Sequence, residues 1–144
     1  MYFFVVMASN DPLDPASIAN KWGQAADAGF AAVPNVLVLA QAKLGLSAND
    51  VVVVLNLLVH WWRSDRQPYP APSTIAKRAG LGLRTVQRSL RQLADKGLVH
   101  KDTSGSRHSY DLSGLVAALA AKAPAYVRPG SRAIRDAKEV TNVF

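Results

Sequence analysis

The chain has 144 residues, a formal net charge of +7 and no cysteine. This length suits one domain with a substantial core plus extensions. The hydrophobic content of 49% is too high for a broadly disordered protein. The lack of cysteine excludes disulfides, thiolate metal sites and a cysteine nucleophile.

Positive charge is concentrated in one part of the chain. Residues 1–62 have a net charge of −2, whereas residues 73–111 carry eight basic and three acidic side chains. Such asymmetry is expected when one face of a protein meets a polyanion. The sequence therefore favours nucleic acid as a partner.

Two apolar runs, residues 2–8 and 51–59, are too short to span a bilayer. The first also lacks the basic residues that open a signal peptide. We therefore expect a cytoplasmic protein, associated with the nucleoid or a plasmid, with no membrane partner.

Residues 1–33 read as an N-terminal extension that is partly helical. A helix over residues 16–28 would place Ile18, Trp22 and Ala25 on one side. Pro34 suits the first turn of a second helix that runs to about Leu44.

A capping box opens the next element, because Ser47 is followed three residues later by Asp50. The apolar run that follows predicts a helix to about Arg63, although its β-branched residues keep a strand open as an alternative. A helix that is apolar nearly all round lies at the centre of a core or against a partner chain. Trp61 and Trp62 would complete that core, and stacking on bases is the alternative interpretation.

Residues 66–72 form an extended connector with three prolines, which leads into two short helices around a tight turn. Ser73 is the expected N-cap of the first helix, residues 74–79. Gly80 and Gly82 end the first helix and form the turn, and a second helix is expected over residues 83–96. Its apolar face is expected to contain Val86, Leu90 and Leu93.

Two strands, residues 98–101 and 109–112, are predicted to form a β-hairpin around a Gly/Ser tip. A helix over residues 113–122 follows, with Leu115, Val116 and Leu119 on one side. The expected fold class is mostly α with a small β-hairpin (α+β). Residues 123–144 form a basic tail that either contacts phosphates or is a solvated end, and both chain ends are candidates for dimerisation.

The segments PYPAPSTIAKRAG, RTVQRSLRQL and GLVHK give the region 34–122 a family resemblance. It resembles bacterial winged helix-turn-helix DNA-binding proteins and is similar to plasmid- and phage-associated transcriptional regulators and replication initiators. One departure is Ser89, where many members carry an apolar residue, and Leu90 is expected to take that place. The resemblance implies binding of double-stranded DNA, commonly as a homodimer.

Candidate contacts with DNA divide by role. Arginine and glutamine side chains read base edges, whereas basic and small polar groups hold phosphates. The expected base contacts are Arg84, Thr85, Gln87 and Arg88. The expected backbone contacts are Ser73, Lys77, Arg78, Arg91 and Gln92. The β-hairpin over residues 98–112 would be the wing, and its expected DNA contacts are Lys101, Ser106, Arg107 and His108.

No catalytic or metal-binding constellation stands out, and we expect neither an enzyme nor a cofactor. The three histidines lack neighbours at metal-ligand spacing, and the single glutamate and scattered aspartates do not suit a nuclease. The main hypothesis is sequence-specific DNA binding in transcription regulation. The alternatives are a plasmid or phage replication initiator or partition protein, and a winged-helix module that binds proteins.

Overall fold

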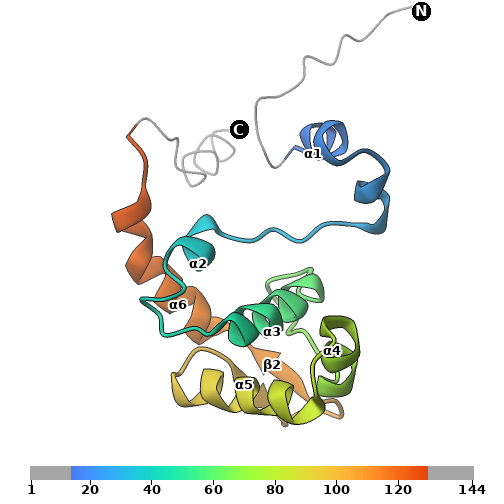
Figure 1. The fold of residues 1–144 in the computed structure, drawn as a ribbon, viewed down its shortest axis with the longest axis vertical. Coiled ribbons are helices and arrows are strands. Elements are labelled where there is room, and N and C mark those ends of the chain that lie inside the picture. Colours follow the sequence, from blue (N-terminus) through green and yellow to red (C-terminus); the bar gives the residue numbers. More distant parts are fainter. Residues whose placement is uncertain (1–13, 130–144) are drawn as a thin grey trace, which may run out of the picture.

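The computed structural model describes residues 14–129, which form a small helical body and a projecting N-terminal arm (Figure 1). The elements in chain order are α1 (Pro15–Trp22), the 3-10 helix Gly23–Ala28, α2 (Asn35–Leu39), α3 (Ala48–Val59), α4 (Pro72–Ala79), α5 (Leu83–Asp95), β1 (His100–Asp102), β2 (Ser109–Asp111), α6 (Ser113–Lys122) and the 3-10 helix Ala123–Tyr126. The two strands pair antiparallel, with His100 opposite Asp111. The structure is thus mostly helical with one two-stranded sheet.

Helix α3 lies at the centre of the body and packs against both α4 and α5. Val53, Val54 and Leu57 are completely buried on its inner side. The helical interpretation of this apolar run is therefore confirmed, and the strand alternative is wrong. Burial of the β-branched residues outweighs their weak helix propensity.

Both ends of α3 have a local cause. At its start the Ser47 side chain accepts a hydrogen bond from the Asp50 backbone, and the Asp50 carboxylate accepts one from Ser47 N–H, which confirms the capping box. The helix ends at Val59, four residues before the predicted end. Trp61 packs against the core, but Trp62 is 84% exposed, so only one tryptophan completes the core as expected.

Helix α2 is shorter than predicted. It ends at Leu39, and residues 40–45 continue as turns rather than as helix. Leu37 and Ala40 are buried, whereas Val38 and Leu39 are more than half exposed. This short helix and the turn that follows it are therefore enough to place Leu37 and Ala40 in the core.

The helix pair α4–α5 is organised around a left-handed glycine. Gly80 has φ +64°, and its backbone N–H donates to the Ala76 carbonyl at the end of α4. The predicted break between the two helices is therefore confirmed. Ser73 is not the N-cap as expected: Pro72 already occupies the first helical position, so Ala71 is the cap and no side chain caps it.

The buried face of α5 differs from the predicted one at one residue. Ser89 is 3% exposed and lies between the buried Val86 and Leu93, whereas Leu90 is only partly buried at the edge of the core. The assignment of Leu90 to this position was wrong. The small serine fits the middle of the stripe, because residues three and seven positions after Val86 share its face.

Helix α6 has the predicted bounds but a narrower buried face. Leu115 and Leu119 are buried, whereas Val116 is 48% exposed, contrary to expectation. The start of α6 docks on the chain after α5, where Leu115 N–H donates to the Leu98 carbonyl at 2.8 Å.

The N-terminal arm contains α1 and the 3-10 helix, and neither contributes a buried residue. The predicted single helix over 16–28 is divided at Gly23, which has φ +55°. The apolar run 2–8 and residues 130–144 of the basic tail lie outside the described residues.

Across residues 14–129, no helix has the length and apolar character needed to cross a membrane.

Candidate nucleic-acid interface

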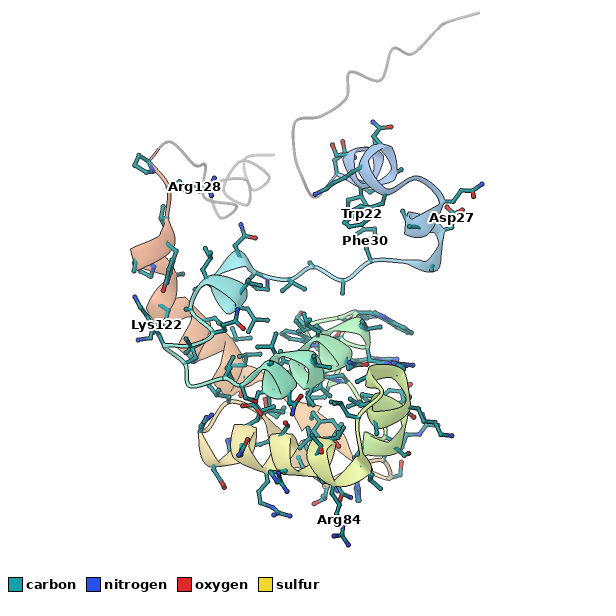
Figure 2. The ribbon with its side chains drawn as sticks, viewed as in Figure 1. Trp22, Asp27, Phe30, Arg84, Lys122 and Arg128 are labelled. Carbon is teal, nitrogen blue, oxygen red and sulfur yellow. The ribbon has the colours of Figure 1, made fainter. Side chains whose placement is uncertain are left out.

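The outward face of α5 is a continuous polar and basic stripe. Residues at helical spacings of three and four share one face, so the exposed positions form one surface. Thr85 is half-buried at the edge of this stripe. Figure 2 shows Arg84 projecting from the start of α5 into solvent. The exposed members of the stripe are Arg84, Gln87, Arg88, Arg91 and Gln92.

The arginines of α5 have no acidic partner within residues 14–129. The salt bridges of this region are Arg63–Asp65 and Lys96–Asp50, neither of which involves the stripe. The single carboxylate on α5 is Asp95, its last residue. The positive charge of the stripe therefore faces solvent without internal neutralisation and is available to an anion.

The N-terminus of α5 adds to the positive potential of the stripe. Its first turn contains no acidic residue, and Gly82 provides no capping side chain. Cations are normally disfavoured at a helix N-terminus, because the backbone dipole is positive there. Arg84 breaks this rule, as residues at binding sites do, and makes this end of the helix attractive to phosphate.

Helix α4 supplies a second row beside the stripe. Ser73 and Lys77 are exposed, with Ser73 in the first turn of the helix. Arg78 is also exposed, but its Nη1 lies 2.7 Å from His60 Nε2. Burial and the Arg78 charge lower the pKa of His60, so the neutral imidazole accepts this hydrogen bond. Arg78 is thus held by α3 rather than free, which the sequence did not indicate.

The hairpin presents its predicted residues on an exposed loop. Lys101, Ser106, Arg107 and His108 are all exposed. Asp102 orders the start of this loop by accepting hydrogen bonds from the Ser104 backbone and hydroxyl at 2.9 and 2.6 Å, which lower the pKa of its carboxyl.

Sequence reasoning missed Tyr69 in this region. The guanidinium of Arg107 lies over the Tyr69 ring, 5.1 Å from its centroid. The signal was present, because Tyr69 is the aromatic residue of the proline-rich connector. Nothing in its spacing pointed to a partner 38 positions later in the chain.

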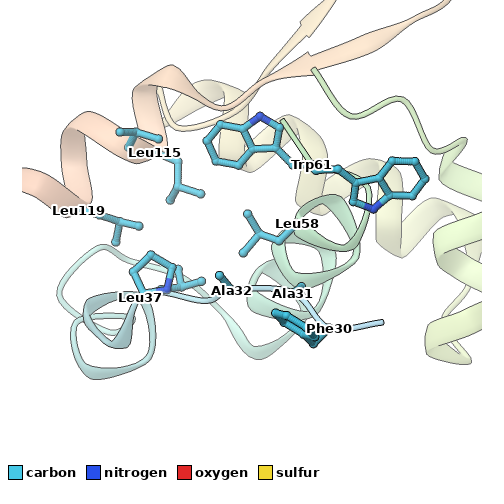
Figure 3. Close-up of a pocket in the computed structure, with 11 residues that line it drawn as sticks. Phe30, Ala31, Ala32, Leu37, Leu58, Trp61, Leu115 and Leu119 are labelled. Carbon is cyan, nitrogen blue, oxygen red and sulfur yellow. The ribbon is translucent and has the colours of Figure 1, made fainter. Parts of the chain in front are cut away.

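An apolar pocket lies away from the α5 stripe, between α2, α6 and the end of α3 (Figure 3). Its volume is about 360 Å³. The extended segment that leaves the arm borders it through Phe30, which is itself 60% exposed. Other lining residues are Leu37, Leu58, Trp61, Trp62, Leu115 and Leu119. Within residues 14–129, no group of three His, Asp or Glu side chains is placed to hold a metal ion.

Comparison with family models shows which family the chain belongs to. The model of the DnaD N-terminal domain matches residues 33–125, well over half of the chain. The chain belongs to the DnaD N-terminal domain family. This family is more specific than the resemblance seen in the sequence, which extended to regulators and initiators alike.

A solved structure agrees with the family assignment at the level of the fold. The crystal structure of the N-terminal domain of DnaD protein from Geobacillus kaustophilus HTA426 is 21% identical, with a TM-score of 0.57. The alignment covers 74% of the present DnaD-family chain and 91% of the other. No curated protein matches the chain.

Proposed function

We propose that this DnaD-family chain binds double-stranded DNA through α4 and α5 and acts in DNA replication. The family is one of DNA replication proteins, which favours the replication alternative over the transcription regulator first expected. The observation that carries the DNA-binding proposal is the unpaired arginine stripe of α5. Its role is binding rather than catalysis.

Within the stripe, we assign base edges to Arg84, Thr85, Gln87 and Arg88. Arginine can bond in pairs to guanine and glutamine to adenine, whereas the short threonine side chain suits contact with a thymine methyl group. The exposed groups on either side of these residues would hold the phosphates that fix the register on the duplex. These backbone contacts are Ser73, Lys77, Arg91 and Gln92. Arg78 would reach a phosphate from its position against His60.

The hairpin is assigned the role of a wing. It follows α5 directly, and its tip presents the exposed Arg107 and His108. The connector runs beside β2, where Tyr110 N–H donates to the Pro68 carbonyl at 2.9 Å, in the manner of a third strand. A helix pair followed by a hairpin with this extra backbone contact is the arrangement expected of a winged helix-turn-helix. Lys101 and Ser106 would complete the phosphate contacts of the wing.

The arm supports a homodimer as the functional form. Trp22 and Phe30 are each 60% exposed, and α1 buries none of its residues in its own chain. The apolar pocket of Figure 3 lies in the same half of the molecule and has room for a large side chain. We assign this pocket to the arm of a second copy, with Trp22 as the inserted residue.

Sedimentation equilibrium tests the dimer. Trp22→Ser is expected to weaken self-association, and Leu83→Ser, which changes an exposed apolar residue of α5 outside the pocket, is the control. A purely monomeric wild-type chain, or an unchanged dimer in Trp22→Ser, would contradict the assignment.

Selection of bound duplexes from a random library tests the function. Repeated sites that also occur at a replication origin would support a replication role, whereas one inverted repeat at promoters would favour transcription regulation. Recovery of no duplex at any salt concentration would refute DNA binding and favour a protein-interaction module.

A further inference from the structure

We infer that Tyr69 is a positioning residue that holds Arg107 in place for a DNA phosphate. This inference rests on the proposed function, because it concerns how the wing meets the duplex. It assigns a role in DNA binding to the connector between α3 and α4, which also runs beside β2.

The first observation is the contact itself. The Arg107 guanidinium lies 5.1 Å from the centroid of the Tyr69 ring, within the range of a cation–π interaction. Arg107 has no acidic partner and no hydrogen-bonded partner within residues 14–129. Its N–H donors therefore remain available to a phosphate while the ring face contacts the guanidinium.

The second observation is that the backbone on either side of Tyr69 is held in place. Pro68 and Pro70, on either side of Tyr69, are buried, and each proline fixes its own φ angle. The Pro68 carbonyl accepts the Tyr110 N–H at 2.9 Å, and Gln67 Oε1 accepts the Ser109 hydroxyl at 2.6 Å. Three consecutive connector residues thus contact the hairpin or its loop.

The third observation is the exposure of the ring. Tyr69 is 56% exposed, so it is not needed to fill the core. An exposed ring on an anchored backbone supports Arg107 without enclosing it. Arranging a long side chain before binding reduces the conformational entropy lost when the complex forms.

Four variants of the full chain, titrated with one duplex at physiological salt, test the inference. Tyr69→Leu removes the ring face and is expected to weaken binding about two- to five-fold, the range of an exposed cation–π contact. Tyr69→Phe retains the ring and should bind as the wild type does. Arg107→Ala should bind more weakly, and Tyr69→Leu combined with Arg107→Ala should be no weaker than Arg107→Ala alone.

Lys101→Ala provides the matched control, since Lys101 is an exposed cation of the same hairpin that does not contact Tyr69. Its loss should add to that of Tyr69→Leu. Melting temperatures of all variants should agree, which separates positioning from a structural role.

Three results would overturn the inference. Wild-type affinity in Tyr69→Leu would show that the ring is unimportant, and a further loss on Tyr69→Leu in the Arg107→Ala background would place Tyr69 itself on the DNA. Failure of Tyr69→Phe to bind normally would assign the effect to the hydroxyl. These outcomes require a wild type that binds duplex, whereas a wild type that does not bind refutes the proposed function and the inference together.

Discussion

Replacing Gly114 with alanine tests how α6 is joined to the rest of the body. A Cβ at this position would lie 1.9 Å from the Gly97 carbonyl oxygen and 3.2 Å from that of Leu98. Both obstacles are backbone atoms, so no side-chain rotation can relieve the clash. The start of α6 would have to move away by about 1.5 Å to reach ordinary contact at 3.4 Å.

The expected cost follows from three terms. Overpacking a closely fitted site costs about 1–3 kcal/mol. The same movement strains the hydrogen bond from Leu115 to the Leu98 carbonyl, which contributes about 1 kcal/mol. Alanine returns about 0.5–1 kcal/mol, because it favours the helix more than glycine does. The net expectation is a loss of about 1–3.5 kcal/mol in the free energy of unfolding.

Chemical and thermal denaturation measure this loss, which should lower the melting temperature by roughly 10 °C. Gly105→Ala is the matched control, since its Cβ would meet only the Arg107 carbonyl at an ordinary 3.8 Å and should change stability by less than about 0.5 kcal/mol. If Gly114→Ala were as stable as the wild type or more stable, helix propensity alone would govern this site. The close approach of α6 to residues 97–98 would then be refuted.

Three further predictions follow from the same structure. Ser47→Ala should lower the free energy of unfolding by about 0.5–2 kcal/mol in urea titrations through loss of the capping box, and an unchanged value would contradict it. Because burial and Arg78 lower the pKa of His60, the folded state holds fewer protons than the unfolded state just below the ordinary pKa of 6.5. Stability should therefore fall as pH decreases through 6.5 towards the lowered pKa, and melting curves of His60→Gln should lack this component. Arg88→Ala should relax base preference at one position by about 1–3 kcal/mol, whereas Arg91→Ala should weaken all sequences alike, and equal behaviour of the two variants in competition assays would refute the division of roles.

The sequence predicted the elements that depend on local signals. The capping box at Ser47, the left-handed glycine at position 80 and the span of α6 all appear in the structure. Each depends on the chemistry of a few neighbouring residues. The ends of α2 and α3 were misplaced, because tertiary burial decides how far an apolar helix continues.

Contacts between distant segments escaped prediction. The arginine stripe of α5 was visible from helical spacing, but the pairing of Arg78 with His60 joins α4 to the residue that caps the end of α3. The exchange of Ser89 for Leu90 in the core depends on how α5 is rotated against α3, which periodicity gives only to within one residue. The stripe could therefore be found from sequence, whereas the contacts of Arg78 with His60 and of Arg107 with Tyr69 could not.

Salt-dependent titration of paired variants with duplex DNA tests whether the α4–α5 face is the binding interface. Arg84→Ala with Arg88→Ala removes two charges from the stripe, and Lys43→Ala with Lys122→Ala removes two charges from residues outside α4 and α5. We expect the first pair to weaken binding and to lower the slope of log affinity against log salt by about two, while the second pair changes neither. Equal losses from the two pairs would show that binding follows net charge alone, and would contradict an interface on α4–α5.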